Sequence, residues 1–129
     1  MKLAFTVSSA GDHPSLERRF GRCPYFLIVD TETRDRECLP NPSTVTRGGA
    51  GTQAAQFLAA RDVDAVVSGE FGPNAFATLD AAGIRMYTAQ GGQVDALVED
   101  FLAERLARVM TNTGGYRRDR RRIRSGRKR

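Results

Sequence analysis

The chain has 129 residues, of which 40% are hydrophobic, so it can form one domain with a real core. Its net charge of +5 is uneven: residues 116–129 hold nine of the 20 basic residues and carry +8, which leaves −3 elsewhere. Two cysteines 15 positions apart exclude a disulfide framework or a four-thiolate site. The lack of a long apolar stretch predicts a soluble cytoplasmic protein that does not contact membranes.

The first third of the chain predicts three strands. Residues 2–7 alternate between apolar and polar side chains, which is the period of a half-buried strand. A polar segment at 8–21 separates it from an apolar run at 24–30. A polar turn and a short strand at 36–39 follow, so the second and third strands should form a hairpin.

The central segment, 48–83, predicts a glycine loop, a helix, a buried strand, a second glycine loop and a second helix. Thr52 is placed to cap the first helix. The unbroken apolar run at 65–67 is typical of a parallel strand that is buried on both faces. Pro73 or Asn74 should begin the second helix, and Gly83 should end it.

The last part of the domain predicts a strand at 84–87 and one long amphipathic helix. The apolar residues of this helix fall at helical spacing over four turns: Val94, Leu97, Val98, Phe101, Leu102, Leu106 and Val109. Strands that alternate with helices indicate an α/β domain at 1–110. The basic residues 111–129 predict a disordered tail, because they contain too little apolar surface to form a core.

Three loops should meet at the carboxyl ends of the parallel strands: residues 8–21, 68–74 and 88–92. Ligands of open α/β sheets bind at this edge. We therefore expect the functional site there.

Four motifs carry a resemblance to a known family: FGRCPYFLIVD at 20–30, GGAG at 48–51, GEFGPNA at 69–75 and AGI at 82–84. In this order they resemble the dinitrogenase iron–molybdenum cofactor biosynthesis family, which contains nitrogenase accessory domains of the NifX and NifY type and domains fused behind NifB. The resemblance spans residues 2–109. It implies a three-layer α/β/α fold with a mixed, mostly parallel five-stranded sheet and a ribonuclease-H-like motif.

The resemblance also implies a function. Members of this kind bind or carry an iron–sulfur or molybdenum–iron–sulfur cluster or its precursor and are not enzymes. Their expected partners are cofactor-assembly proteins or a metalloenzyme that accepts the cluster. The alternative that two subunits of a homodimer share one cluster stays open.

Candidate site residues follow from what a metal–sulfur anion needs: soft or imidazole ligands, positive neighbours and backbone N–H donors. Cys23 and His13 are the candidate metal ligands, although no family motif fixes a ligand at either position. Each also has a structural interpretation: Cys23 as a small buried apolar residue, and His13 as a solvent-exposed turn residue. Arg22 would supply positive charge, and Gly49 and Gly51 would permit close backbone approach. Gly72 and Asn74 complete the candidates; they serve the turn and the helix start first, with any ligand contact secondary.

Catalysis is not supported by the sequence. A ribonuclease-H-like nuclease needs clustered carboxylates, one of them on the first strand, and residues 2–8 contain no acid. The GGAGT segment lacks the Lys-Ser/Thr ending of a phosphate-binding loop. His13 is the only histidine, and no Ser-His-Asp arrangement stands out.

The basic tail suggests an alternative function. Nine basic residues within residues 116–129 would bind phosphate backbones without sequence preference. Tyr116 is the one aromatic residue there, so base stacking would contribute little. The alternative is therefore a weak nucleic-acid-binding or protein-interaction module that binds no cluster.

Overall fold

The computed structural model describes residues 1–45 and 49–110. The predicted tail, residues 111–129, and the first part of the GGAG loop lie outside these ranges. One six-stranded sheet has the order β3–β2–β1–β4–β5–β6. Its strands are β1 (Lys2–Val7), β2 (Tyr25–Asp30), β3 (Arg36–Pro40), β4 (Ala65–Ser68), β5 (Arg85–Thr88) and β6 (Ala107–Arg108).

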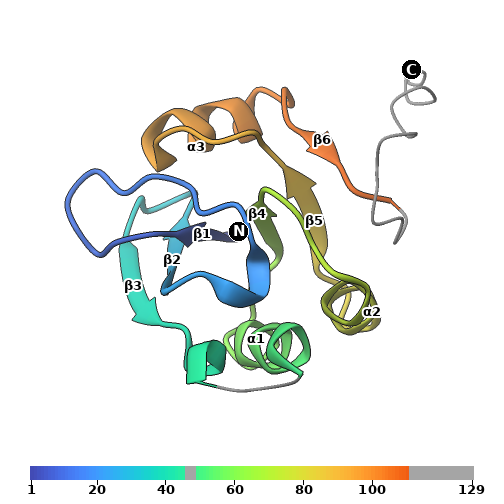
Figure 1. Ribbon diagram of the computed structural model, residues 1–129. Coiled ribbons are helices and arrows are strands. Elements are labelled where there is room, and N and C mark those ends of the chain that lie inside the picture. Colours follow the sequence, from blue (N-terminus) through green and yellow to red (C-terminus); the bar gives the residue numbers. More distant parts are fainter. Residues whose placement is uncertain (46–48, 111–129) are drawn as a thin grey trace.

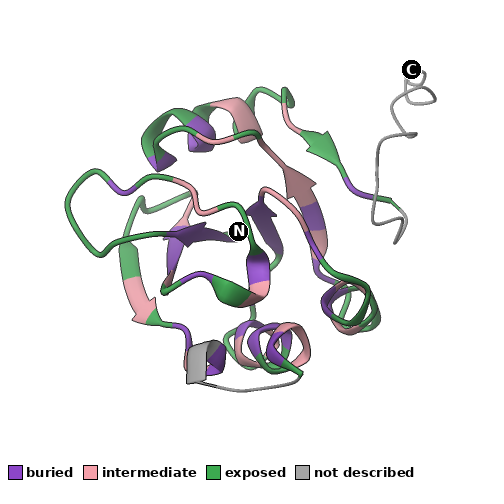
Figure 2. Ribbon diagram, in the orientation of Figure 1, coloured by how far each residue is buried: buried purple, intermediate pink, exposed green. Residues whose placement is uncertain are grey.

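In the part of the chain that the structure describes, three α-helices pack on the two faces of the sheet and give the predicted three-layer α/β/α arrangement (Figure 1). Helices α1 and α2 lie on one face, and α3 lies on the other (Figure 1). Each face has its own apolar cluster, and β1 and β4 are buried almost throughout (Figure 2). The helices are α1 (Ala50–Ala59), α2 (Pro73–Ala81) and α3 (Val94–Leu102), with short 3-10 turns η1 (Phe20–Arg22) and η2 (Pro42–Val45).

The sheet is mixed, as expected, but the expectation of five strands, most of them parallel, was wrong. Only the β1–β4 and β4–β5 pairs are parallel, whereas β1–β2, β2–β3 and β5–β6 are antiparallel. The ribonuclease-H-like motif stays a prediction. Across residues 1–45 and 49–110, no helix combines the length and the apolar character needed to cross a membrane.

The sixth strand comes from the segment that was predicted to be the end of the long helix. Helix α3 ends at Leu102, and Glu104 adopts a left-handed backbone conformation with φ of 60°. The chain then turns back to pair with β5, and Val109 donates its N–H to the Met86 carbonyl at 2.8 Å. Leu106 and Val109 pack into the clusters on opposite faces of the sheet, so their helical spacing was coincidental.

The predicted helix boundaries near the glycine loops are partly confirmed. Pro73 opens α2, and Gly83 follows its end with φ of 77° and donates its N–H to the Asp80 carbonyl at 3.0 Å. Thr52 does not cap α1. The helix begins two residues earlier, at Ala50, and Gly49 precedes it with φ of 73°, a conformation that favours glycine.

Candidate anion-binding site

The three predicted loops do meet at the carboxyl ends of the parallel strands. Leu16 donates its N–H to the Gly92 carbonyl at 2.8 Å, which joins the first loop to the third. Glu70 donates to the Arg18 carbonyl at 2.8 Å, and Phe20 donates to the Glu70 carbonyl at 3.2 Å, which joins the first loop to the second. These bonds continue the sheet hydrogen bonding beyond the strands and fix the segment that leads into η1.

Gly69 allows the first two loops to approach this closely. A Cβ atom at this position would lie 2.7 Å from the Arg18 carbonyl oxygen and 2.8 Å from the Arg18 Cα. Backbone atoms cannot rotate away as the end of a side chain can. Any residue larger than glycine must therefore push the two loops apart.

We expect Gly69→Ala to lower the free energy of unfolding by about 1–3 kcal/mol, the usual cost of overpacking. Gly11→Ala is the matched control, because its Cβ would meet open space, its φ is not in the left-handed region and it lies in an exposed loop. The control should stay within about 0.5 kcal/mol of the unaltered protein in urea unfolding. Equal effects of the two changes would contradict the close contact at Gly69.

The amino ends of α1 and α2 meet η1 at one place, which we call the amino-end junction: residues 21–22, 49–51 and 72–75. A Cβ atom on Gly51 would lie 3.0 Å from the Ala75 Cβ, so the two helices touch at their first turns. A Cβ atom on Gly21 would lie 3.1 Å from the Gly51 nitrogen. Five predicted site residues are thereby brought to this junction: Arg22, Gly49, Gly51, Gly72 and Asn74.

The junction presents partial positive charge. The first hydrogen bond within α1 runs from the Gln53 N–H to the Gly49 carbonyl, and the first within α2 runs from the Phe76 N–H to the Gly72 carbonyl. The backbone N–H groups that precede Gln53 and Phe76 therefore have no partner within their own helix. Neither N-cap residue supplies a capping side chain, and neither first turn contains an acid. Two adjacent helix amino ends with small residues between them favour an anion.

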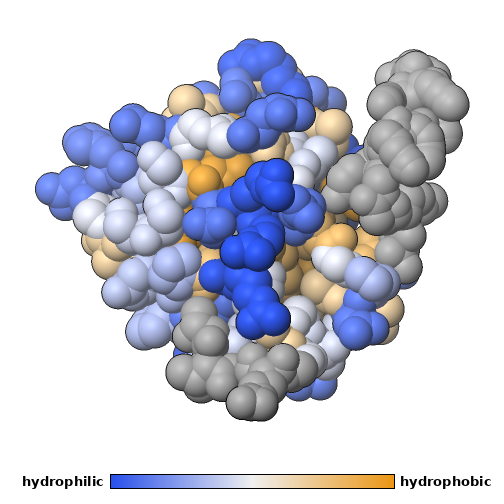
Figure 3. Space-filling view, viewed as in Figure 1, coloured by the Kyte–Doolittle hydropathy of each residue, from blue (hydrophilic) through white to orange (hydrophobic). Residues whose placement is uncertain are grey.

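Exposed arginines surround this part of the surface. Arg18, Arg19 and Arg22 are all exposed on the segment that precedes β2. In the orientation of Figure 1, a strongly hydrophilic band passes over this segment (Figure 3). Glu70 adds a carboxylate, but its Oε2 lies 3.2 Å from the Arg18 Nε. This ion pair offsets the repulsion that the Glu70 carboxylate would exert on an anion here.

Cys23 does not lie on this surface. Its side chain is fully buried in the cluster beneath α1 and α2, and its thiol donates to the Phe20 carbonyl at 3.3 Å. Burial raises the pKa of Cys23 to about 12, although a hydrogen bond from Asn41 opposes this shift. A metal ligand must be a thiolate that the metal can reach. The geometry therefore does not support Cys23 as a ligand, and its structural interpretation fits better.

We expect alkylation by iodoacetamide at pH 8 to modify Cys38 at least tenfold faster than Cys23. Burial raises the pKa of both thiols, and a raised pKa lowers the thiolate fraction at a given pH, but only Cys38 is partly exposed on edge strand β3. In denaturant both thiols should regain an ordinary pKa and react alike. Timed labelling with mass spectrometry checks this, and equal rates in the native protein would contradict the burial of Cys23.

His13 lies away from the amino-end junction. It is exposed, and its Nδ1 lies 3.7 Å from the Asp95 carboxylate on α3, the helix on the opposite face of the sheet. Cys23 packs on the α1 and α2 side. The structure thus separates the two predicted ligands. Within residues 1–45 and 49–110, no three His, Cys, Asp or Glu side chains are grouped so that they could hold a metal ion.

Sequence reasoning missed the side chains that hold η1 in place. Asn41 is 3% exposed and donates its Nδ2 to the Cys23 carbonyl at 2.9 Å. Ser43 donates its hydroxyl to the Gly21 carbonyl at 3.1 Å and its N–H to the Asn41 Oδ1 at 2.9 Å. We call Asn41 and Ser43 the Asn–Ser clasp. Asn41 lies between Pro40 and Pro42, and Ser43 follows them, a pattern that signalled only a turn.

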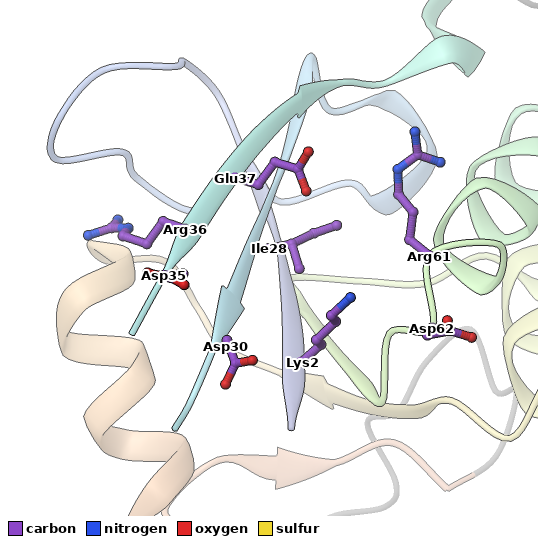
Figure 4. Close-up of a pocket in the computed structure, with 8 residues that line it drawn as sticks. All are labelled: Lys2, Ile28, Asp30, Asp35, Arg36, Glu37, Arg61 and Asp62. Atoms are coloured by element: carbon purple, nitrogen blue, oxygen red, sulfur yellow. The ribbon is translucent and has the colours of Figure 1, made fainter. Parts of the chain in front are cut away.

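A separate hollow of about 360 Å³ lies at the other end of the sheet (Figure 4). Lys2, Glu37 and Arg61 surround Ile28 there (Figure 4). None of the predicted site residues lines it. Its acidic and basic side chains are mixed, so it does not favour a cluster anion.

The chain is similar to known proteins over most of its length. The family model described as dinitrogenase iron-molybdenum cofactor matches residues 1–104. An uncharacterized protein of Methanocaldococcus jannaschii is 30% identical over 109 residues, which are 82% of this chain and 89% of that protein.

Two solved structures are similar at more than 30% identity. The apo form of the orange protein from Desulfovibrio gigas has a TM-score of 0.80 and 34% identity over 84% of this chain and 92% of that one. A proposed NifB protein from Thermotoga has a TM-score of 0.76 and 31% identity over 87% of this chain and 96% of that one. With the family model covering most of the chain, these similarities show that the protein belongs to the dinitrogenase iron-molybdenum cofactor family.

Proposed function

We propose that this protein binds and carries an anionic metal–sulfur cluster, or a precursor of one, at the amino-end junction. The observation that carries the proposal is the contact between the first turns of α1 and α2 at Gly51 and Ala75, beside Gly21. The N–H groups of two helix first turns thus lie beside Gly21, in the segment that carries the exposed Arg18, Arg19 and Arg22. The family description supports a bound group of this class, and the apo form of the similar orange protein indicates that this relative also has a bound form.

The cluster is cargo and not a catalytic group of this chain. The sulfides of a metal–sulfur anion accept hydrogen bonds from backbone N–H groups and from guanidinium groups. The junction supplies both kinds of donor. We therefore propose that the cluster is held without a Cys23 thiolate and that the protein is not an enzyme.

This mode of binding suits transfer to a partner. A cluster held by hydrogen bonds and charge can leave without the breaking of a metal–protein bond. The proposed partners are cofactor-assembly proteins that load the cluster or a metalloenzyme that accepts it. Either partner would have to approach the loop edge of the sheet.

The test is anaerobic incubation of the full chain with iron, sulfide and molybdate, followed by gel filtration. We expect charge-transfer bands in the ultraviolet–visible spectrum, with metal and sulfide in fixed ratio to protein. Metal alone, without sulfide, is the control and should not be retained. A colourless protein that retains neither metal nor sulfide would overturn the proposed function.

A further inference from the structure

A second hollow, of about 640 Å³, lies between α3, β5, β6 and the start of the chain. Its walls include Met1, Tyr87, Phe101, Leu102 and Leu106. It lies at the end of the sheet where β1 and β5 begin, away from the amino-end junction. Apolar and aromatic side chains form about half of its walls, and Thr31, Arg85, Glu104 and Arg108 form the rest, a mixture that suits an amphipathic small molecule.

The apolar wall contains an ordered aromatic pair. The rings of Tyr87 and Phe101 meet edge to face, with centroids 5.1 Å apart and an angle of 87° between the ring planes. Leu102, 44% exposed, and Met1, 37% exposed, leave large apolar side chains open to the hollow and solvent. The wall can therefore cover the apolar body of a ligand.

Arg85 gives the hollow a positive group, whose hydrogen-bond partners within residues 1–45 and 49–110 are neutral. Its Nη1 donates to the Tyr87 hydroxyl at 3.3 Å, and its Nη2 lies 3.7 Å from the Met1 sulfur. Among the described residues, neither Arg85 nor Arg108 on the same wall forms an ion pair. By contrast, nearby Arg105 lies 2.9 Å from the Asp100 carboxylate.

We propose that this hollow binds a small organic carboxylate with an aromatic body. The carboxylate would lie at Arg85, whose planar guanidinium can donate two parallel hydrogen bonds to it. The aromatic body would pack on Tyr87, Phe101 and Leu106. Glu104 is the one acid on the wall, so the two arginines leave it with a net positive charge. This site is independent of the cluster proposed above.

The probe is 2-naphthoate, and 2-naphthamide is its uncharged control of nearly the same shape. Each is titrated into the full-length, ¹⁵N-labelled protein at about 150 mM salt, where exposed charges are screened. Amide shifts give both the affinity and the location. Location is decisive, because the basic residues 116–129 also attract anions.

We expect saturable shifts at Arg85, Tyr87, Phe101 and Leu106 with the acid and at least tenfold weaker binding of the amide. Arg85→Gln should weaken binding of the acid about tenfold, the loss of a charged hydrogen bond. Arg105→Gln is the matched control and should leave the affinity for 2-naphthoate unchanged. Equal binding of acid and amide, shifts confined to other residues, or no saturation up to about 10 mM would each overturn the proposal. The comparison of 2-naphthoate with 2-naphthamide uses the unaltered protein, so it does not depend on whether a variant folds.

Discussion

Replacement of Phe20 by alanine is expected to lower the free energy of unfolding by about 3–5 kcal/mol, the usual loss for a buried phenylalanine. Phe20 is 1% exposed, and its ring centroid lies 5.5 Å from those of both Phe26 and Phe71. It therefore joins η1 to the sheet and to the loop that leads into α2. The loss leaves a cavity in the cluster beneath α1 and α2.

Urea unfolding measures this loss as a lower midpoint with an unchanged slope. Phe76→Ala is the control, because Phe76 packs against the same cluster but is only partly buried. Phe20→Leu should cost less than Phe20→Ala, since most of the buried volume remains. A Phe20→Ala loss no larger than that of Phe76→Ala would contradict the central position of Phe20 in the core.

Replacement of Arg18, Arg19 and Arg22 together by glutamine is expected to weaken cluster binding by on the order of 100-fold. Each exposed guanidinium that contacts the anion contributes about 1 kcal/mol after solvent screening, and 1.4 kcal/mol corresponds to a factor of ten. The change also leaves Glu70 without its ion-pair partner beside the anion. Dissociation constants for the loaded cluster at a fixed salt concentration measure the effect.

The matched control is the triple replacement of Arg61, Arg105 and Arg108 by glutamine. It removes the same net charge from exposed positions outside the amino-end junction. We expect cluster affinity to change less than threefold. If both triple variants bind equally weakly, the attraction comes from total charge and the junction is not the site. Far-ultraviolet circular dichroism should show that both variants remain folded.

Local residue chemistry predicted much of the fold. Pro73 and Gly83 marked the limits of α2, because their backbone preferences act where they stand. The meeting of the three loops followed from the rule that parallel strands share a carboxyl edge. Five of the seven site candidates reached one junction because glycine and helix starts cluster at that edge.

The parts that could not be predicted depend on contacts far apart in the chain. The end of α3 lies near Glu104, where no glycine or proline signals a stop, and pairing with β5 decides it. Cys23 is buried among residues from several distant elements, and Asn41, 18 positions away, donates to its carbonyl. Likewise, His13 approaches Asp95 on α3 only through the fold. The spacing of residues in the sequence does not predict these long-range contacts.

The central claim is that the amino-end junction holds a metal–sulfur anion without a protein thiolate. The most direct measurement is metal and sulfide per chain after anaerobic loading of the double variant Cys23→Ala and Cys38→Ala. The Asn–Ser clasp should survive, because Asn41 bonds to the backbone carbonyl of residue 23 and not only to its thiol. We predict the same metal and sulfide content as in the unaltered chain. Loss of loading in a folded, cysteine-free chain would contradict this account and restore a cysteine as the ligand.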